Sequence, residues 1–504
     1  MRNDETKQLI HHKNINTMNN ELSKLYPSAV WNCFASICDT PHPSKHEGKI
    51  LAWLKKWAEE NHIEYHQDET GNMLFRKPAT PGMENRKTVI LQGHIDMVPQ
   101  ANSDKKHDFL TDPIEPMIGN DGWVRANGTT LGADNGMGCA AAMAVLLSKD
   151  IAHGPIEVLV TVDEETGMTG AFGLQKNFAQ GDILINLDSE TEGELYVGCA
   201  GGLDALIEMD YSEVDAPAGM NGYRLSITGL KGGHSGMDIA LGRANANKVM
   251  FRFLRKSITQ FGARIACVKG GSLRNAIPRE AVADLAVPAD QAAAFTAFVK
   301  DFSDTIAKEF AKTEPALSIT LDTIAAPAKV MCEKCQRKAV DMVFALPNGV
   351  MRMSDAMADL VETSVNLAVV TIDGGKLHTA SLLRSSVDSA KEAVGEKMTA
   401  IAELAGATIT LSGAYPGWKP NMDSPILNTM LKVYKDKFGT EPTIKAIHAG
   451  LECGLFGVCY PHWDMISFGP TICHPHSPDE RVNIESVGRF WDFLVETLKN
   501  IPTK

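Results

Sequence analysis

Three acidic residues end the apolar run "EVLVTVDEE" (157–165), namely Asp163, Glu164 and Glu165. Adjacent carboxylates beside an apolar interior repel each other and lose hydration, so a proton or a cation normally compensates them. Neighbouring residues at a strand end point in different directions, so one carboxylate could bind a metal while the next accepts a proton. For this stretch alone, a solvated strand end is the competing interpretation.

Histidine and carboxylate donors also occur in four other motifs. The H-x-D pair of "GHIDMVP" places His94 and Asp96 on one face of an extended backbone, where the acid can hold the ring N–H while the other nitrogen binds a metal. The remaining donors are Asp134 in "TLGADNGMG", Asp188 in "NLDSETEGE", and His474 and His476 in "PTICHPHSPDE". Each motif alone is also typical of an ordinary turn, helix cap or loop. Together they form a donor set without cysteine that suits zinc, or manganese and cobalt, and five or more donors suit two ions.

Short apolar strands are expected to position these donors. Three β-rich apolar runs cover residues 88–93, 156–162 and 182–187, with helical patterns such as residues 136–149 between them. Continuously apolar strands that alternate with helices are typical of a sheet buried on both faces. Sites in such α/β folds gather beyond the carboxyl ends of the strands. We therefore expect an α/β fold with the donors at one edge of its sheet.

The start of one helix is marked by a capping box. In "PHPSKHEGKILAWL", Ser44 can cap the first amides and Glu47 can reach back to them. The apolar spacing that follows predicts a helix through roughly residue 60.

The pattern changes between residues 212 and 404. Alternating strands there interleave with helices at about residues 245–259, 289–311 and 389–405, which indicates an inserted α/β layered domain. We expect a catalytic domain formed by residues 20–211 and 405–504, with residues 212–404 inserted as a second domain and residues 1–19 as a polar tail. A length of 504 residues also exceeds the usual size of one hydrophobic core.

Bulk properties argue against several classes of protein. A formal charge of −13 disfavours nucleic acid as the main partner. No stretch approaches the roughly 18 to 20 apolar residues of a membrane span, and the N-terminus lacks the apolar core of a secretory signal. Of ten scattered cysteines, only Cys332 and Cys335 form a C-x-x-C, which we interpret as reduced thiols. A cytoplasmic protein without membrane or nucleic-acid partners is expected.

Six motifs, in order, resemble those of the di-zinc metallopeptidase family of aminoacylases, carboxypeptidases and dipeptidases: "GHIDMVP", "GADNGMG", "DEETGM", "NLDSE", "GGHSG" and "PHSPDE". The stretches "GLKGGHSG", "LRNAIPRE", "GAYPGW" and "HAGLECGLF" further resemble its bacterial aminoacyl-histidine dipeptidase (Xaa-His dipeptidase, carnosinase-like) branch. The resemblance spans residues 20–503. It implies a di-zinc exopeptidase-type catalytic domain, whose mixed sheet is flanked by helices, and an inserted α/β lid domain.

The resemblance also implies a set of metal ligands. His94 and Asp188 would bind one zinc ion, Glu165 and His476 the other, and Asp134 would bridge the two ions. Cobalt or manganese are possible substitutes, because they accept similar donors. The peptide bond between residues 134 and 135 is expected to be cis.

The remaining roles come from the same resemblance. Asp96 would orient His94, and Glu164 would be the general base. His234 in "KGGHSG" would assist at the oxyanion, and Asn275 and Arg384 would bind substrate, so that closure of the lid completes the site. Asp163 is expected to be structural.

These assignments predict a metal-dependent peptidase that hydrolyses small dipeptides, preferentially Xaa-His dipeptides such as β-alanyl-histidine. An N-acyl amino acid deacylase with the same core and a non-catalytic binding module are the alternatives. Retention of the base and of all five ligands argues against the binding module. A homodimer is possible, and so is a monomer.

Overall fold

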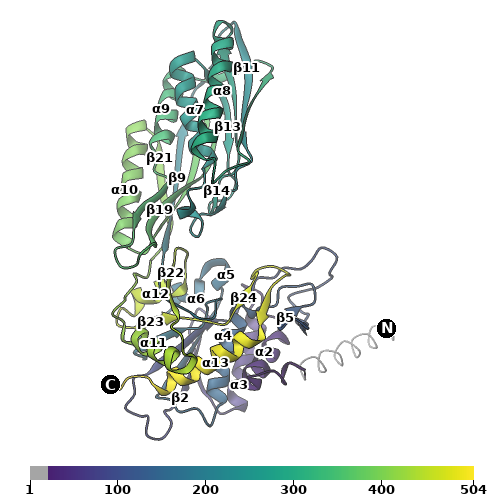
Figure 1. Ribbon diagram of the computed structural model, residues 1–504, viewed down its shortest axis with the longest axis vertical. Coiled ribbons are helices and arrows are strands. Elements are labelled where there is room, and N and C mark those ends of the chain that lie inside the picture. Colours follow the sequence, from purple (N-terminus) through teal and green to yellow (C-terminus); the bar gives the residue numbers. More distant parts are fainter. Residues whose placement is uncertain (1–20) are drawn as a thin grey trace. The chain divides into compact units, whose positions relative to one another are not determined.

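The computed structural model describes residues 21–504, so the expected polar tail of residues 1–19 lies outside the described residues. The chain forms two compact units (Figure 1). Unit 1 contains residues up to 198, residues 421–446 and residues 455–504, and unit 2 contains residues 199–420 and 447–454. Unit 2 is thus longer than the expected insert of residues 212–404. The reason is that β9 (Gly201–Asp210) and β21 (Thr408–Tyr415), which flank that insert, pair with each other in its sheet.

Unit 1 is built on a mixed sheet, which confirms the predicted α/β fold class. Among the described residues, eight strands lie in the order β1-β2-β6-β3-β7-β23-β8-β22. The central strands β6, β3, β7 and β23 are parallel, whereas β2 and β8 run antiparallel to their central neighbours. The strands are β1 (Glu64–Gln67), β2 (Met73–Lys77), β3 (Val89–His94), β6 (Ile156–Thr161), β7 (Ile183–Asn186), β8 (Glu194–Cys199), β22 (Thr443–Ile447) and β23 (Asp464–Ser467). Every residue of β3, β6 and β7 is buried, as their largely apolar character predicts.

Helices and a second, small sheet complete unit 1. Its helices include α2 (Ser28–Cys38), α3 (Gly48–Glu60), α4 (Ala133–Leu147), α5 (Glu164–Gly167), α6 (Thr169–Gly173), α11 (Pro425–Phe438) and α13 (Ile484–Lys499), while α12 (Glu452–Cys459) begins in unit 2. Helix α4 packs against β3 and against α2. The small antiparallel sheet has the order β24-β25-β5-β4, with β4 (Pro116–Ile118), β5 (Trp123–Ala126), β24 (Ile472–Cys473) and β25 (Arg481–Asn483). The pairing of β25 with β5 links the C-terminal segment, which carries His476, to the segment that leads into α4.

The predicted capping box before α3 is wrong. The N-cap residue of α3 is Glu47, and its side chain makes no cap hydrogen bond. Ser44 instead donates its hydroxyl to Oδ2 of Asp96 at 2.7 Å. Oε1 of Glu47 accepts the backbone N–H of Asp163 at 3.1 Å. Both side chains are buried, so they satisfy polar groups near the expected site rather than the first amides of the helix.

Unit 2 contains an antiparallel sheet with helices packed against it. Within residues 21–504 its strands lie in the order β16-β11-β15-β13-β19-β20-β9-β21, and β18 also pairs with β19. The strands not yet given are β11 (Met220–Thr228), β13 (Arg264–Gly270), β15 (Ala281–Pro288), β16 (Ser318–Ile324), β18 (Gly349–Met353), β19 (Val361–Asp373) and β20 (Lys376–Ser385). Two short pairs, β10 (Glu213–Asp215) with β17 (Lys329–Met331) and β12 (Gly233–His234) with β14 (Ala276–Ile277), lie beside this sheet.

The helices of unit 2 largely match the predicted ranges. They are α7 (Ala246–Phe261), α8 (Ala292–Glu309), α9 (Glu333–Ala345) and α10 (Asp388–Ala405), and α9 is the one that the predicted ranges omit. Helices α8 and α9 both pack against α7 (Figure 1). Helix α7 also contacts β15 and β19. Their apolar faces and the sheet enclose one core, which contains Phe253, Phe295 and Phe302.

Two findings concern the expected cellular context. None of the helices in residues 21–504 combines the length and apolar character needed to cross a bilayer. Cys332 and Cys335 form a disulfide, so the prediction of reduced thiols at this pair is wrong. Cys332 is the N-cap of α9 and its sulfur accepts the backbone N–H of Cys335 at 3.1 Å, because the first helical turn brings the two side chains together.

Candidate metal centre

Most of the predicted donors meet at the carboxyl ends of neighbouring strands. His94 is the last residue of β3, and Asp188 follows the end of β7 by two residues. Glu164 and Glu165 begin the short helix α5, which follows β6. Because β6, β3 and β7 are adjacent and parallel, these four side chains lie at one edge of the sheet.

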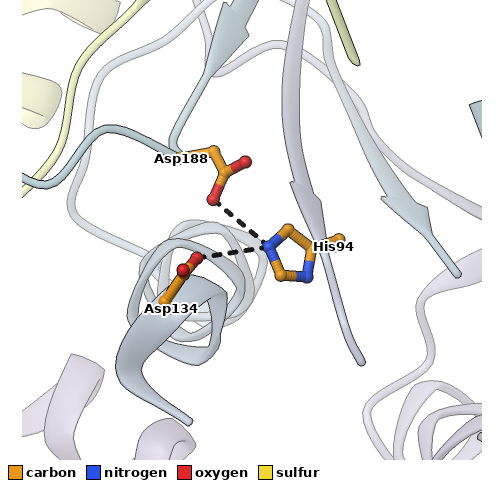
Figure 2. Close-up of side chains that lie close together, drawn as sticks. All are labelled: His94, Asp134 and Asp188. Carbon is orange, nitrogen blue, oxygen red and sulfur yellow. Dashed lines mark hydrogen bonds and ion pairs between the residues drawn. The ribbon is translucent and has the colours of Figure 1, made fainter. Parts of the chain in front are cut away.

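Asp134 lies between two histidine–carboxylate pairs. Its Oδ1 is 3.3 Å from Nε2 of His94, and its Oδ2 is 3.2 Å from Nε2 of His476. Nε2 of His94 is also 3.3 Å from Oδ1 of Asp188 (Figure 2). Nε2 of His476 is 2.9 Å from Oε2 of Glu165. Each oxygen of the Asp134 carboxylate therefore faces a different histidine–carboxylate pair, as a ligand shared by two ions would.

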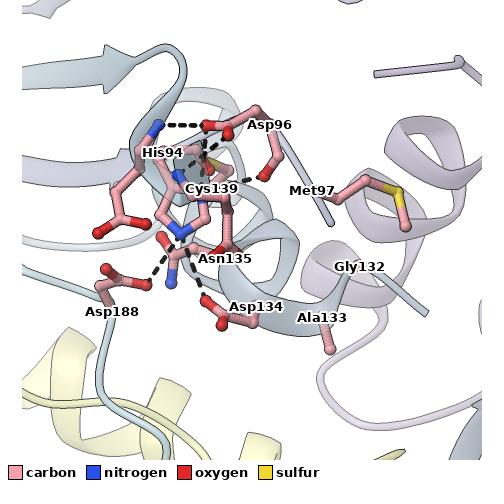
Figure 3. Close-up of polar contacts among 12 residues, drawn as sticks. His94, Asp96, Met97, Gly132, Ala133, Asp134, Asn135, Cys139 and Asp188 are labelled. Carbon is pink, nitrogen blue, oxygen red and sulfur yellow. Dashed lines mark hydrogen bonds and ion pairs between the residues drawn. The ribbon is translucent and has the colours of Figure 1, made fainter. Parts of the chain in front are cut away.

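The ring of His94 is oriented through its other nitrogen. Nδ1 lies 3.0 Å from the backbone oxygen of Asp96 and 3.4 Å from Oδ1 of the same residue (Figure 3). These acceptors hold a proton on Nδ1, so Nε2 is the ring nitrogen that faces Asp134 and Asp188 and is available to a metal. Burial alone would lower the pKa of His94, but Asp188 and Asp134 outweigh burial and raise this pKa well above its usual range.

His476 stands on the loop between β24 and β25 and is about half exposed. Hydrogen bonds with Asp134 and then with Glu165 raise the pKa of His476 to about 11. Burial would raise the pKa of Asp134, yet its contacts with His476 and His94 bring that pKa below its usual range. The carboxylates around the two imidazoles therefore favour positive charge at this position.

Asp96 also fixes the turn that carries the two adjacent acids. Its Oδ1 accepts the backbone N–H of Glu164 at 3.0 Å, and its Oδ2 accepts that of Glu165 at 3.3 Å. Together with the Ser44 hydroxyl, these contacts engage both oxygens of a carboxylate that is 1% exposed. Carboxylate oxygens of Glu164 and Glu165 and a ring nitrogen of His94 all lie within 4.8 Å of one another. Asp163 accepts the hydroxyls of Thr166 and Thr169, as a structural acid would.

The predicted cis peptide bond between Asp134 and Asn135 is present. The side chain of Asn135 is buried, and its amide donates to the backbone oxygen of Leu187 at 2.7 Å, next to the loop that carries Asp188. A Cβ on Gly93 would lie 2.2 Å from Oδ1 of Asn135, so only glycine fits at this position of β3. Asn135, which follows Asp134, therefore packs directly against the strand residue that precedes His94. Figure 3 shows Asn135 beside Asp134 and His94.

The donor set fits divalent cations. Burial raises the pKa of Asp188 to about 7, although His94 opposes this shift. Burial, with the charges of Asp134 and Asp188, raises the pKa of Glu190 to about 8. Oε1 of Glu165 is buried and has no hydrogen-bond partner within the described residues. A surplus of buried carboxylate oxygens beside two imidazoles is the chemistry that a pair of zinc, manganese or cobalt ions satisfies.

The other predicted residues lie together in unit 2. His234 pairs with Ala276 across β12 and β14, and the backbone oxygen of Asn275 accepts the N–H of Ser235 at 2.8 Å. Nδ1 of His234 accepts two backbone N–H groups at 3.0 and 3.2 Å, so its proton lies on Nε2. Burial and the charge of Arg384 lower the pKa of His234, which favours this neutral tautomer.

Arg384 is 5% exposed, and within the described residues its guanidinium contacts neutral groups. Nε and Nη1 donate to the hydroxyls of Ser235 and Tyr415, each at 3.3 Å, and Nη2 lies 3.4 Å from Nε2 of His234. Burial lowers the pKa of this guanidinium. A buried cation surrounded by hydroxyls and an imidazole is suited to a carboxylate ligand.

His448 and Glu452, which are four residues apart, do not form a helical pair. Helix α12 begins at Glu452, and His448 precedes it in unit 2. Nε2 of His448 lies 2.7 Å from the hydroxyl of Ser364 on β19. The geometry therefore indicates a structural role for His448.

Residues 90–500 match the sequence profile of peptidase family M20/M25/M40. The chain belongs to this family. It is therefore a peptide hydrolase, and the predicted resemblance is confirmed at the level of the family.

Two relatives match this M20/M25/M40 peptidase along nearly its whole length. The cytosol non-specific dipeptidase of Escherichia coli (strain K12) is 48% identical over 96% of this chain and 100% of its own length. The crystal structure of aminoacylhistidine dipeptidase from Vibrio alginolyticus has a TM-score of 0.92 and 49% identity, covering 96% of this chain and 98% of that chain. A tripeptidase from Staphylococcus aureus, with a TM-score of 0.55 and 15% identity, covers 95% of this chain and 99% of its own and shares the fold.

Two acidic residues near the predicted ligands were not identified from the sequence. Glu190 stands in the quoted motif "NLDSETEGE", but a turn acid has no pattern that predicts its place near the charges of Asp134 and Asp188. Glu480 closes the motif "PHSPDE", and its buried carboxylate accepts backbone N–H groups of residues 131–134. Only the three-dimensional fold brings these segments together.

Proposed function

We propose that this peptidase hydrolyses dipeptides, preferentially Xaa-His dipeptides such as β-alanyl-histidine, with two bound zinc ions. The observation that carries the proposal is the position of Asp134, whose two oxygens each face one histidine–carboxylate pair. The substrate class is supported by the two relatives that match nearly the whole chain, since both are named dipeptidases and one is named for aminoacylhistidine.

His94 and Asp188 would hold one zinc ion, Glu165 and His476 the second, and Asp134 both. Bound there, the ions would polarise the peptide carbonyl and lower the pKa of the attacking water. Cobalt or manganese would suit the same oxygen and nitrogen donors.

Glu164 would act as the general base. Its backbone N–H is held by Asp96, which positions the start of α5 before substrate arrives. Its carboxylate can accept a proton from the attacking water and then deliver that proton to the leaving amine. Glu165, one residue on, uses its own carboxylate towards His476, so the two adjacent acids have separate tasks.

The unit 2 residues would bind the rest of the substrate. Arg384 offers a planar, buried guanidinium to the C-terminal carboxylate, and Asn275 would be a second substrate-binding residue. His234, with its proton on Nε2, can donate to the oxyanion that forms at the scissile carbonyl. A location in the cytoplasm is supported by the name of the Escherichia coli relative.

The test compares wild type with Glu164→Gln on β-alanyl-histidine and on its N-acetyl derivative, with bound zinc quantified in both proteins. We expect wild type to cleave only the free dipeptide. The variant should lose about 10²- to 10⁴-fold in kcat, the usual contribution of a general base, while it keeps its zinc.

Asp163→Asn is the matched control, because Asp163 is the neighbouring acid and its carboxylate accepts the hydroxyls of Thr166 and Thr169 in its own turn. It should lose less than about tenfold in kcat. Cleavage of the N-acetyl compound would instead indicate a deacylase. A wild-type protein that binds no zinc would contradict the proposed metal centre, and an active Glu164→Gln would contradict the assignment of the base.

A further inference from the structure

A single buried carboxylate holds the loop that precedes Asp134. Glu480 is 1% exposed. Its Oε2 accepts the backbone N–H groups of Leu131 and Gly132 at 2.7 and 3.0 Å. Its Oε1 accepts those of Ala133 and Asp134 at 2.8 and 3.2 Å. Four consecutive amides thus converge on one side chain.

This loop needs an external partner because its backbone is irregular. Gly132 has a φ of +71°, and Asp134 and Asn135 have non-helical backbone angles inside the first turn of α4. The N–H groups at a helix start have no partner within the helix. A carboxylate that accepts four of them satisfies the loop and also fixes its direction, since each hydrogen bond constrains a different peptide plane.

Glu480 also links two of the proposed ligands. It lies four residues after His476, and the strand that follows it, β25, pairs with β5 through Val482 and Val124. The loop of His476 and the loop of Asp134 therefore share one anchor. A displacement of Glu480 would change the distance between the Asp134 carboxylate and the imidazole of His476.

We infer that Glu480 is a positioning residue of the proposed metal centre: it fixes residues 131–134 so that Asp134 presents one oxygen to each histidine. The inference rests on the proposed function, in which Asp134 is the shared ligand. Glu480 acts through the backbone and touches neither substrate nor metal. The Asp96 carboxylate likewise accepts the backbone N–H groups of Glu164 and Glu165. The loop of Asp134 and the turn of Glu164 and Glu165 are thus each held by a buried acid from elsewhere in the chain.

The first test is zinc affinity of the metal-free protein, measured by competition with a chromophoric chelator for wild type and Glu480→Gln. Glutamine has the same size, but its NH₂ group must face one of the two pairs of N–H groups that the carboxylate now accepts. We expect zinc binding to weaken by about 10- to 100-fold, as for other groups that support a metal ligand. kcat for dipeptide hydrolysis should fall while KM stays within about threefold of wild type, because the substrate contacts are untouched.

Glu157→Gln is the matched control. Glu157 is also buried in unit 1, and its Oε2 accepts the consecutive N–H groups of Gln180 and Gly181 at 2.7 and 2.9 Å. It stands at the amino-terminal end of β6, whereas the proposed site lies beyond the carboxyl end of that strand. This variant should lower the melting temperature and leave zinc affinity unchanged. If Glu480→Gln behaves in the same way, with zinc affinity and kcat both retained, Glu480 is merely structural and the inference is wrong.

A second measurement does not depend on the variant folding well. In the metal-free wild type, hydrogen exchange of the backbone amides of residues 131–134 should be slow, because Glu480 and not the metal protects them. Rapid exchange of these amides would overturn the inference. Glu480→Asp retains the charge but is one methylene shorter, so its zinc affinity should lie between those of wild type and Glu480→Gln.

The outcomes separate the inference from the proposed function. A wild-type protein that neither binds zinc nor cleaves dipeptides would contradict the proposed function. Slow exchange at residues 131–134 would still support Glu480 as the anchor of the Asp134 loop. A wild type that binds zinc and is active, with a Glu480→Gln protein that matches it in every readout, would contradict the inference alone.

Discussion

Replacement of the shared carboxylate should separate the two proposed zinc sites. Asp134→Asn keeps the shape of the side chain but exchanges one carboxylate oxygen for an NH₂ group, which cannot bind a cation. The remaining oxygen can face either His94 or His476, which lie 3.3 and 3.2 Å from the two oxygens of Asp134, but not both. One zinc site should therefore lose a ligand, and the other should lose only the negative charge.

The size of the effect follows from the burial of this side chain, which is 11% exposed. Loss of one partner from a buried charge pair costs about 3–5 kcal/mol. At about 1.4 kcal/mol per factor of ten, the affected zinc ion should bind roughly 10²- to 10⁴-fold more weakly. Dipeptide hydrolysis should fall at least as far, because it requires both ions.

Isothermal titration of metal-free protein with zinc would measure this effect directly. Wild type should show two tight sites, and Asp134→Asn one. Asp464→Asn is a suitable control, because Asp464 accepts hydrogen bonds from Ser424 and Ile426 at the start of β23, away from the carboxyl ends of the strands. Two tight zinc ions in Asp134→Asn would refute the idea that one carboxylate serves both halves of the site.

Three further changes probe unit 2. Arg384→Lys should raise KM for dipeptides about 10- to 100-fold because the planar fork is lost, whereas Arg252→Lys, at an exposed ion pair with Glu309, should leave KM unchanged in steady-state assays. His234→Gln should lower kcat by about 10²- to 10³-fold with zinc content unchanged, as loss of one oxyanion donor does. Burial, with the charge of Arg384, lowers the pKa of His448 to about 3, so the unfolded state takes up this proton near pH 6.5 and the folded state only near pH 3. Stability from this group is present above pH 6.5 and is lost as the pH falls towards 3, by about 1.4 kcal/mol per pH unit. His448→Gln should thus move the acid-unfolding midpoint, followed by circular dichroism, to lower pH, and an unchanged midpoint would contradict the shift.

The strands that carry the site could be predicted because burial on both faces leaves a simple signature. β3, β6 and β7 are largely apolar, and His94, Asp163 and Asp188 stand at or just after their carboxyl ends. Parallel neighbours then place those ends at one edge of the sheet. The allocation of individual ligands, in contrast, came from the resemblance to a family, because spacing alone is equally compatible with ordinary turns and caps.

Local patterns failed where a distant partner competes for the same group. Ser44 and Glu47 have the spacing of a capping box, yet Asp96 and the N–H of Asp163 bind their side chains instead. A short-range rule compares only local hydrogen bonds, whereas folding selects the set that leaves the fewest buried groups unpaired. Cys332 and Cys335 were interpreted from composition, although their helical turn brings the two sulfurs into bonding distance.

Glu480 could not be identified from sequence patterns. Even its nearest amide partner along the chain, the N–H of Asp134, is 346 residues away. Burial raises the pKa of this carboxyl to about 7, even though the amides oppose that shift. Burial of this acid costs stability through desolvation, and the hydrogen bonds from the amides offset only part of that cost. An apolar residue at position 480 would avoid that desolvation but would leave four amides of an irregular loop unpaired. Retention of the acid is thus explained by the loop, and the loop's shape is in turn explained by the need to present Asp134 to two histidines at once.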